Sequence, residues 1–172
     1  MKKMFLSLLM IIMAGMMTAQ AQKFALIDME FILKQIPSYE QANKQMETLS
    51  KQWQTEIEAK SKEAKALYEA YQKSAQTMTT EQRTVKEEEI IAKEKEAAEL
   101  RQTYFGPQGE AMKKRQELIS PIQDAIYNAV KEIATQKGYD AVIDRASAQS
   151  MIFASPRIDI SNEVLLKLGY SK

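Results

Sequence analysis

The chain has 172 residues, of which 45% are hydrophobic and 27% charged, and it contains neither Cys nor His. The lack of Cys excludes disulfides, thiolate metal ligands, Cys nucleophiles and a lipid-modified N-terminal Cys. Because 24 basic side chains nearly balance 23 acidic ones, the chain has no long-range field to recruit nucleic acid, and we expect no such partner.

Residues 1–21 have the organisation of a secretory signal peptide. A basic start precedes an apolar run, Met4–Met17, which is too short to span a bilayer comfortably, and the small-residue sequence Ala19-Gln20-Ala21 follows. We weigh this against a buried N-terminal helix and favour the signal, because the small residues follow the run directly. We therefore expect cleavage after Ala21 and a soluble mature chain in the periplasm, with a net charge of about −1 once the two lysines near the start are removed.

The mature chain begins with a strand and continues into a long helix. Lys23–Asp28 is a short apolar run with alternation, which predicts a half-buried strand. From Met29 to about Met78 the sequence has no Gly and one interruption at Pro37, which predicts a short helix and then a long one. Apolar side chains recur along it in steps of three and four residues, as in a coiled-coil seam. The seam residues are Tyr39, Ala42, Met46, Leu49, Trp53, Ile57, Ala64, Leu67, Tyr71, Ala75 and Met78.

This seam is irregular in its middle. The two consecutive steps of four from Leu49 through Trp53 to Ile57 form a stutter, which locally unwinds a coiled coil. Lys60 then occupies a position where the seam calls for an apolar residue. The apolar stripe is therefore thin here, and we expect a flexible hairpin.

The helix turns back after Met78. Thr77–Glu81 breaks the apolar pattern, and a Thr before Glu81 is a suitable N-cap for the next helix, so we place the tip of a hairpin at 77–80. The returning helix, from Glu81 to about Tyr104, has many Glu and Lys side chains three or four residues apart and is mostly solvated. Phe105–Gly109, with one Pro and two Gly, is expected to kink or break it.

The C-terminal part predicts a packed helix, two strands and a last helix. Ser120-Pro121 resembles an N-cap with Pro at the first helical position, and Gly138 is well placed to end that helix. Tyr139–Asp144 and Ser150–Phe153 are short apolar runs typical of strands. Ser161 is expected to cap the last helix.

The order of these elements predicts an α+β fold, dominated by a long antiparallel helical hairpin on a small β-sheet body. We define the arm as residues 39–117 and the body as residues 22–38 plus 118–172. At ~1.5 Å per residue, each limb of the arm extends on the order of 65 to 70 Å. A body of about 70 residues with a three-stranded sheet is marginal alone, so we expect self-association.

Four segments carry a resemblance to a known family. KFALIDMEFIL, KKRQELISPIQDAIYNAVKEIA, GYDAVIDRA and NEVLLKL resemble the Skp (OmpH-like) periplasmic chaperones, over essentially the whole mature chain. The resemblance implies a homotrimer with a central β-barrel, and helical arms around a cavity that holds unfolded outer-membrane proteins without ATP or any cofactor. It also implies a set of barrel-packing residues. These are Phe24, Leu26, Val142, Ile143, Ile152 and Phe153.

Aromatic and Met side chains on the arm are candidates for contact with such clients, because polarizable side chains suit promiscuous surfaces. The candidates are Met46, Trp53, Tyr68, Tyr71, Met78, Tyr104 and Phe105. The alternative is that they hold the hairpin together. We favour hairpin packing for Leu49, Trp53 and Leu67, which follow the seam, and exposure for Tyr68, which does not.

Catalysis and metal binding are not indicated. The chain lacks His and Cys, and its five Gly form neither a phosphate loop nor a nucleophile turn, so we expect no catalytic residue and no enzyme. Glu87-Glu88-Glu89 cannot converge on one ion, because successive helical residues point about 100° apart. The basic run Lys113-Lys114-Arg115 could meet a lipid phosphate or an acidic client, but a solvated helix face explains it as well.

The sequence therefore predicts an ATP-independent periplasmic holdase for unfolded outer-membrane proteins. One rival is a coiled-coil scaffold of the envelope, which would need a continuous seam and an anchor. The other is a peripheral membrane-surface protein, which would need a basic amphipathic face. Near-neutral charge distinguishes the chain from the strongly basic relatives it resembles, and leaves contact with membrane or lipopolysaccharide as an open question.

Overall fold

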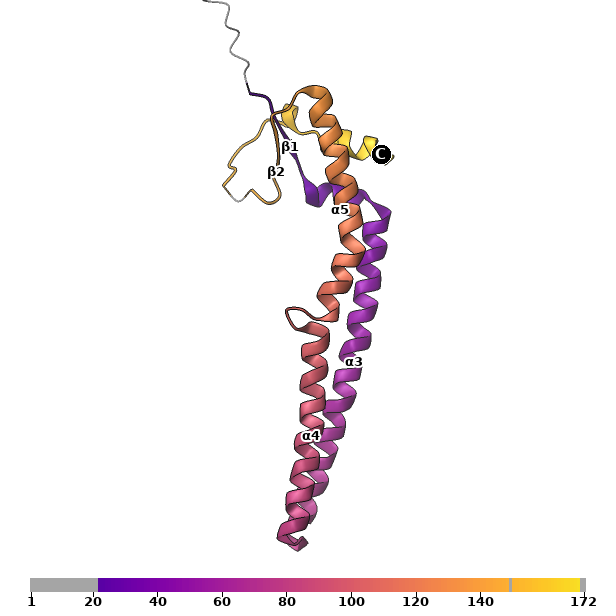
Figure 1. Ribbon diagram of the computed structural model, residues 1–172, viewed down its shortest axis with the longest axis vertical. Helices are drawn as coiled ribbons and strands as arrows, with labels where there is room; N and C mark the ends of the chain where they lie inside the picture. The colour runs from indigo at the N-terminus through magenta and orange to yellow at the C-terminus, as the bar shows by residue number, and fades with distance from the viewer. Residues whose placement is uncertain (1–21, 149, 171–172) are drawn as a thin grey trace, which may run out of the picture.

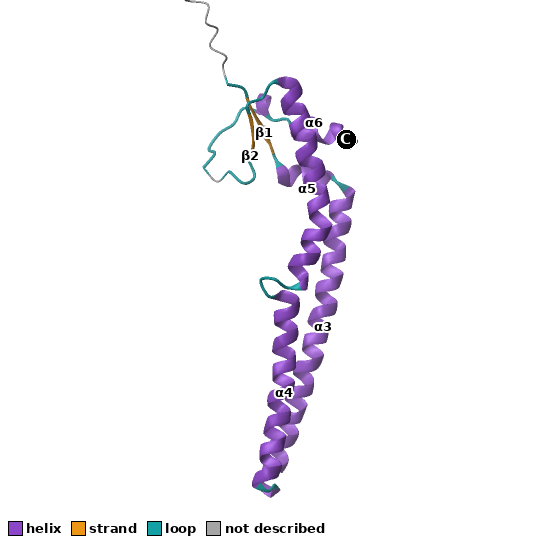
Figure 2. Cartoon of the chain, viewed as in Figure 1, coloured by secondary structure: helices purple, strands orange, loops and turns teal. Residues whose placement is uncertain are grey.

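The computed structural model describes residues 22–148 and 150–170; the expected signal peptide and its cleavage site at Ala21 lie outside them. A small group of helices and strands forms one end, and two long helical limbs run side by side away from it to a tip (Figure 1). The fold is mostly helical with a two-stranded sheet, as Figure 2 shows. Among the described residues no helix is both long enough and apolar enough to cross a membrane.

The sheet pairs the start of the chain with a segment more than a hundred residues later. Strand β1 (Phe24–Ile27) lies parallel to β2 (Ala141–Asp144), with Phe24 opposite Ala141. Parallel strands need a crossover connection, which the whole helical excursion supplies. Both strands were predicted within the runs Lys23–Asp28 and Tyr139–Asp144, and these predictions are confirmed.

The prediction of a third strand over Ser150–Phe153 is wrong. The segment lies in an open loop after β2, where Ile152 is fully exposed and Phe153 is 82% exposed. The physical reason is that β1 already has β2 on one edge, whereas its other edge accepts a bridge between Leu26 and Asp159. An apolar run in the sequence does not show whether a sheet edge is free to pair with it.

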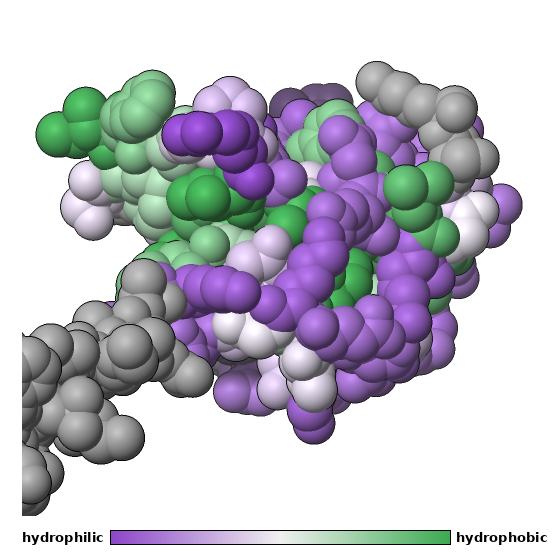
Figure 3. Space-filling view, turned by 90° about the horizontal axis from the view of Figure 1, so that it is seen from above, coloured by the Kyte–Doolittle hydropathy of each residue, from purple (hydrophilic) through white to green (hydrophobic). Residues whose placement is uncertain are grey.

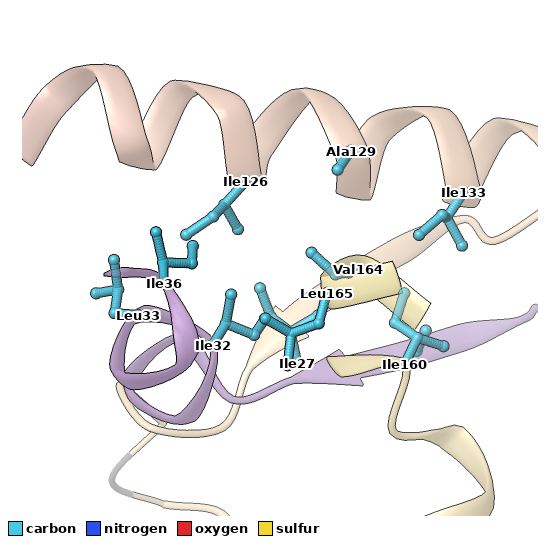
Figure 4. Close-up of a cluster of buried hydrophobic side chains, with 11 residues drawn as sticks. Ile27, Ile32, Leu33, Ile36, Ile126, Ala129, Ile133, Ile160, Val164 and Leu165 are labelled. Atoms are coloured by element: carbon cyan, nitrogen blue, oxygen red, sulfur yellow. The ribbon is translucent and has the colours of Figure 1, made fainter. Parts of the chain in front are cut away.

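The core lies where the helices cover one face of the sheet. Helix α2 (Met29–Gln35) contributes Ile32 and Leu33, which face Ile126 of α5 (Glu110–Lys137) across the core (Figure 4). Helix α6 (Ser161–Lys167) adds Val164. The side chains of Ile32, Ile126 and Val164 are completely buried, so this cluster ties the two ends of the chain together.

The arm is a helical hairpin whose first long helix ends at Ser74, a turn earlier than the expected end near Met78. Helix α3 (Pro37–Ser74) starts with Pro at its first position, which suits the fixed φ of Pro. A short 3₁₀ turn, η1 (Ala75–Thr77), leads to α4 (Thr80–Phe105). Thr79 caps α4 in a capping box with Gln82, which confirms the expected Thr N-cap.

The return limb breaks after Phe105 and resumes as α5. Gly106–Gly109 forms a loop that protrudes from the limb in Figure 1. Helix α5 then runs without interruption through Pro121, so the prediction that a helix starts at Ser120-Pro121 is wrong. Helix α5 already begins after Gly109. Pro121 lacks a backbone donor and its ring crowds the carbonyl four residues earlier, and burial of Ile119, Ile126 and Ile133 on the same helix offsets this cost. Gly138 ends α5 at φ 67°, as predicted.

Polar contacts fasten the C-terminal ends of the strands to the helices. Asp28 caps α2 by accepting a hydrogen bond from the Phe31 N–H (2.8 Å), and its own N–H donates to Ser161 Oγ (2.8 Å). Ser161 is the first residue of α6 and not its cap, contrary to our expectation, because Ile160 holds the capping position. The hydroxyl of Ser161 instead donates to Asp159 Oδ1 (2.6 Å), which also accepts the Ser161 N–H.

Candidate binding surface

The seam between α3 and the return limb has the apolar periodicity that the spacing on α3 predicts. On α3 the side chains of Ala42, Ile57 and Ala64 are buried, and the other predicted seam residues are half-buried. On α4 only Ile90 and Ala97 are buried. Each limb therefore buries a few small or medium side chains, and the hairpin has a narrow apolar interior.

Aromatic rings fill this seam near the break in the return limb. The indole of Trp53 stacks on the ring of Tyr104, with centroids 5.2 Å apart, and Phe105 meets the indole edge-on at 6.0 Å. The Tyr104 hydroxyl donates to Glu56 Oε2 (2.7 Å), which raises the pKa of the phenol. The structure thus brings three of the candidate contact residues together as hairpin packing, although the ring of Phe105 remains 42% exposed.

The remaining arm candidates divide by exposure. Tyr68 is 48% exposed, as its position off the seam predicts. Met46, Tyr71 and Met78 lie on the seam and are half-buried. The Tyr71 hydroxyl donates to the carboxylate of Glu87 on the opposite limb, which raises the pKa of this phenol too. Contact with a client is therefore open to Tyr68 and Phe105 without rearrangement, and stays a prediction for all of the candidates.

Charged residues link the two limbs where the apolar seam is thinnest. Lys60 of α3 is 3.3 Å from Glu96 of α4, and Lys93 of α4 is 3.7 Å from Glu63 of α3. Lys93 also contacts Glu96 at 3.0 Å. The hydrogen bond from Lys93 is the largest cause of a lowered pKa of the Glu96 carboxyl, and the hydrogen bond from Lys60 is the next. The bond to Glu96 in turn raises the pKa of Lys93. Exposed ion pairs contribute little stability each, so we expect this section of the arm to separate more easily than the aromatic section.

The predicted barrel residues are mostly exposed in the single chain. Phe24 and Ile143 are 44% and 41% exposed, and Ile152 and Phe153 are more exposed still. Leu26 is buried and Val142 half-buried. Seen from above, hydrophobic residues gather on one side of the end opposite the tip, whereas hydrophilic residues cover most of the other side (Figure 3). This apolar surface is available for a partner.

Other charged groups give no sign of a metal or lipid site. In the described part of the chain no three His, Cys, Asp or Glu residues lie close enough to hold a metal ion. In the basic run, Lys113 pairs with Glu110 (2.9 Å) and Lys114 with Glu117 (2.8 Å). Two of its three cations are thus neutralised by their own helix, as on a solvated face.

Sequence reasoning missed two features of the arm. It did not pair Trp53 with Tyr104, because the register between two limbs depends on the exact length of the turn between them. It also missed a hollow of about 360 Å³ between α3 and α4, near Ala64 and Ala97. The signal for the hollow was present, since small residues at seam positions leave space between helices.

Comparisons with known proteins agree on one family. Residues 23–168 match the family described as "Outer membrane protein (OmpH-like)". "Chaperone protein Skp" of Yersinia enterocolitica is 30% identical over 155 residues, which cover 89% of this chain and 90% of that protein. The protein of the same name from Photorhabdus laumondii subsp. laumondii is 30% identical over 146 residues, 84% of each. A solved OmpH-like protein of Caulobacter crescentus CB15, 13% identical, has the same fold, with a TM-score of 0.66 over 86% of this chain and 84% of that one.

Proposed function

The chain belongs to the OmpH-like family, and from this we propose that it is a periplasmic chaperone that holds unfolded outer-membrane proteins without ATP. The names of its relatives in Yersinia and Photorhabdus support the chaperone role. The observation that carries the holding mechanism is the arm itself, a long hairpin with a narrow apolar seam and aromatic side chains exposed along it.

The dimensions of the arm suit this role. The 38 residues of α3 extend about 57 Å at ~1.5 Å per residue, so one arm offers a long surface. Tyr68 and Phe105 present exposed rings along it, and weak contacts of this kind add up when several sites act on one flexible client. Weak contacts also allow release without an energy source, because each of them breaks easily.

We further propose that three chains associate through their sheets. The small body exposes four apolar side chains, those of Phe24, Ile143, Ile152 and Phe153. Burying them against other copies of the chain would stabilise the body. The loop that carries residues 150–153 leaves its apolar side chains exposed, where a neighbouring copy could bury them. Ile152→Asp combined with Phe153→Asp is expected to lower the mass measured by light scattering from that of a trimer to that of a monomer.

The test of the function is aggregation of an unfolded outer-membrane protein diluted from urea, followed by light scattering with the mature chain and without nucleotide. The expected result is strong suppression at a stoichiometric excess of trimer. A trimer that leaves the aggregation rate unchanged would favour a scaffold of the envelope. Suppression that persists in the monomeric double variant would show that single arms hold the client and that no enclosed space is needed.

A further inference from the structure

The hollow on the arm lies where small side chains of the two limbs face each other. It has a volume of about 360 Å³, within the range of small-ligand sites, and lies between α3 and α4 on one flank of the hairpin. Two of its lining residues, Ala64 and Ala97, are buried at 4% and 6% exposure. Ala98 lies beside them and is exposed. The buried methyl groups of Ala64 and Ala97 thus form an apolar floor, which the exposed Ala98 borders, where larger seam residues would have closed the gap.

The rim of the hollow carries an aromatic ring and three charged groups. The ring of Tyr68, 48% exposed, borders the hollow from α3. Lys65 stands beside it and is 3.8 Å from Glu69, at the limit of an ion pair. From α4 come Arg101 and Glu94, neither of which has an ion pair or hydrogen bond with any residue in 22–148 or 150–170. The guanidinium of Arg101 is therefore available at the edge of an apolar space.

Apolar surface continues on the same side of α4. Ile91, Ala98 and Phe105 are seven residues apart and so share one side of the helix. Ile91 is 61% exposed and Phe105 is 42% exposed, one toward the tip and the other toward the body. A polypeptide crossing the hollow would meet apolar side chains on either side of it.

We propose that this hollow is a subsite for an aromatic side chain of an unfolded polypeptide, one that has an acidic residue beside the aromatic one. The inference rests on the proposed function, since it names what the arm recognises. An aromatic ring would lie on the alanine floor, with the Tyr68 ring offset or edge-on against it and the Arg101 guanidinium over its face. Lys65 is paired with Glu69, whereas Arg101 has no ion-pair partner among the described residues, so Arg101 is the rim cation that would meet the acidic neighbour.

The test compares two short unstructured peptides that differ only in having Phe or Leu beside one Asp. Isothermal titration with the full mature chain is expected to show roughly twofold to tenfold tighter binding of the Phe peptide, the size of an aromatic contact. Ala98→Trp fills the hollow and is expected to abolish this preference. The matched control is Ala92→Trp, which places the same ring at an exposed α4 position that does not line the hollow. Arg101→Gln should reduce the preference more than Arg101→Lys does.

The proposal is overturned if the wild-type chain does not distinguish the two peptides, including the case in which neither binds. It is also overturned if Ala92→Trp removes the preference as completely as Ala98→Trp, because the effect would then not depend on the hollow. The aggregation assay separates this from the function itself. A wild-type chain that suppresses aggregation without preferring Phe retains the proposed function and loses only the subsite.

Discussion

The guanidinium of Arg145, just after β2, donates two hydrogen bonds to Asp28 at the end of β1, from Nε at 3.1 Å and Nη2 at 2.9 Å to the same oxygen, Oδ2. The other oxygen of Asp28 caps helix α2. One carboxylate therefore joins both strands and the first helix of the body. Since these elements come from opposite ends of the sequence, the pair closes the fold around the base of the arm.

The first prediction concerns this carboxylate. Asp28→Ala removes the α2 cap and one of the two carboxylates paired with Arg145, the other being Asp159. The substitution is expected to lower the free energy of unfolding by about 1 to 2 kcal/mol, the range for a lost N-cap. Urea unfolding followed by circular dichroism measures the change. Asp124→Ala, an exposed α5 carboxylate with no hydrogen bond or ion pair to the described residues, is the control and is expected to have little effect.

Acid should weaken the same contact. The Phe31 N–H and then Arg145 lower the pKa of Asp28 below its ordinary value of 3.8, although burial opposes the shift. A lowered folded-state pKa adds stability above the unfolded pKa and loses it as the pH falls through the folded one. Asp28→Asn keeps a capping oxygen without titrating. The stability gap between wild type and Asp28→Asn should therefore close at acid pH, and a gap independent of pH would contradict the account.

The second prediction concerns the ionic middle of the arm. Lys60→Leu places an apolar side chain at a seam position that is now one-third exposed, and should slow amide exchange in the surrounding turns of α3 and α4 roughly threefold to tenfold. Lys62→Leu, at an exposed position outside the seam, is the matched control. Exchange in wild type should also accelerate with added salt in this section, because salt screens exposed ion pairs. Equal exchange in the two variants would argue that the ion pairs hold the limbs as well as apolar contact does.

How far the sequence predicts this fold depends on whether the signal is local. Thr79 and Gly138 act within their own turn of helix, so the cap and the left-handed stop could be located from residue type alone. Pro121 carried the same kind of local signal and misled, because packing of the residues around it decides whether a helix continues through a Pro. The prediction of a strand at 150–153 was wrong for a related reason, since a segment forms a strand only where the edge of another strand is free to pair with it.

The candidate site follows the same division. Exposure of Tyr68 could be predicted from helical spacing, because the seam on α3 is a property of one helix. The contact of Trp53 with Tyr104 could not, since it depends on the register between helices separated by a turn. Residue spacing along α3 predicts which of its side chains face the other limb. The residues that they contact there depend on how α4 is placed against α3.

The third prediction uses Trp53, the only Trp in the sequence, as a reporter. Tyr104→Ala removes the stacked ring and is expected to expose the indole, shifting its fluorescence emission to longer wavelength. Tyr104→Phe keeps the ring and loses only the hydrogen bond to Glu56, so its emission should match that of wild type. Identical spectra for all three proteins would mean that the stack does not persist in solution.

The last prediction concerns the break between α4 and α5. A Cβ built on Gly109 would lie 2.7 Å from the Tyr104 carbonyl oxygen and 2.8 Å from that of Thr103, both of them backbone atoms that cannot rotate away. Gly109→Ala must therefore displace the loop, and is expected to destabilise the chain by about 1 to 3 kcal/mol, as overpacking does. Gly138→Ala is the comparison, because its Cβ would meet nothing within 4 Å and the cost comes from the positive φ alone, about 1 kcal/mol. If Gly109→Ala unfolds at the same urea concentration as wild type, the loop accommodates the added methyl group at no cost. The close approach of Gly109 to the backbone of α4 would then not constrain how α5 follows α4.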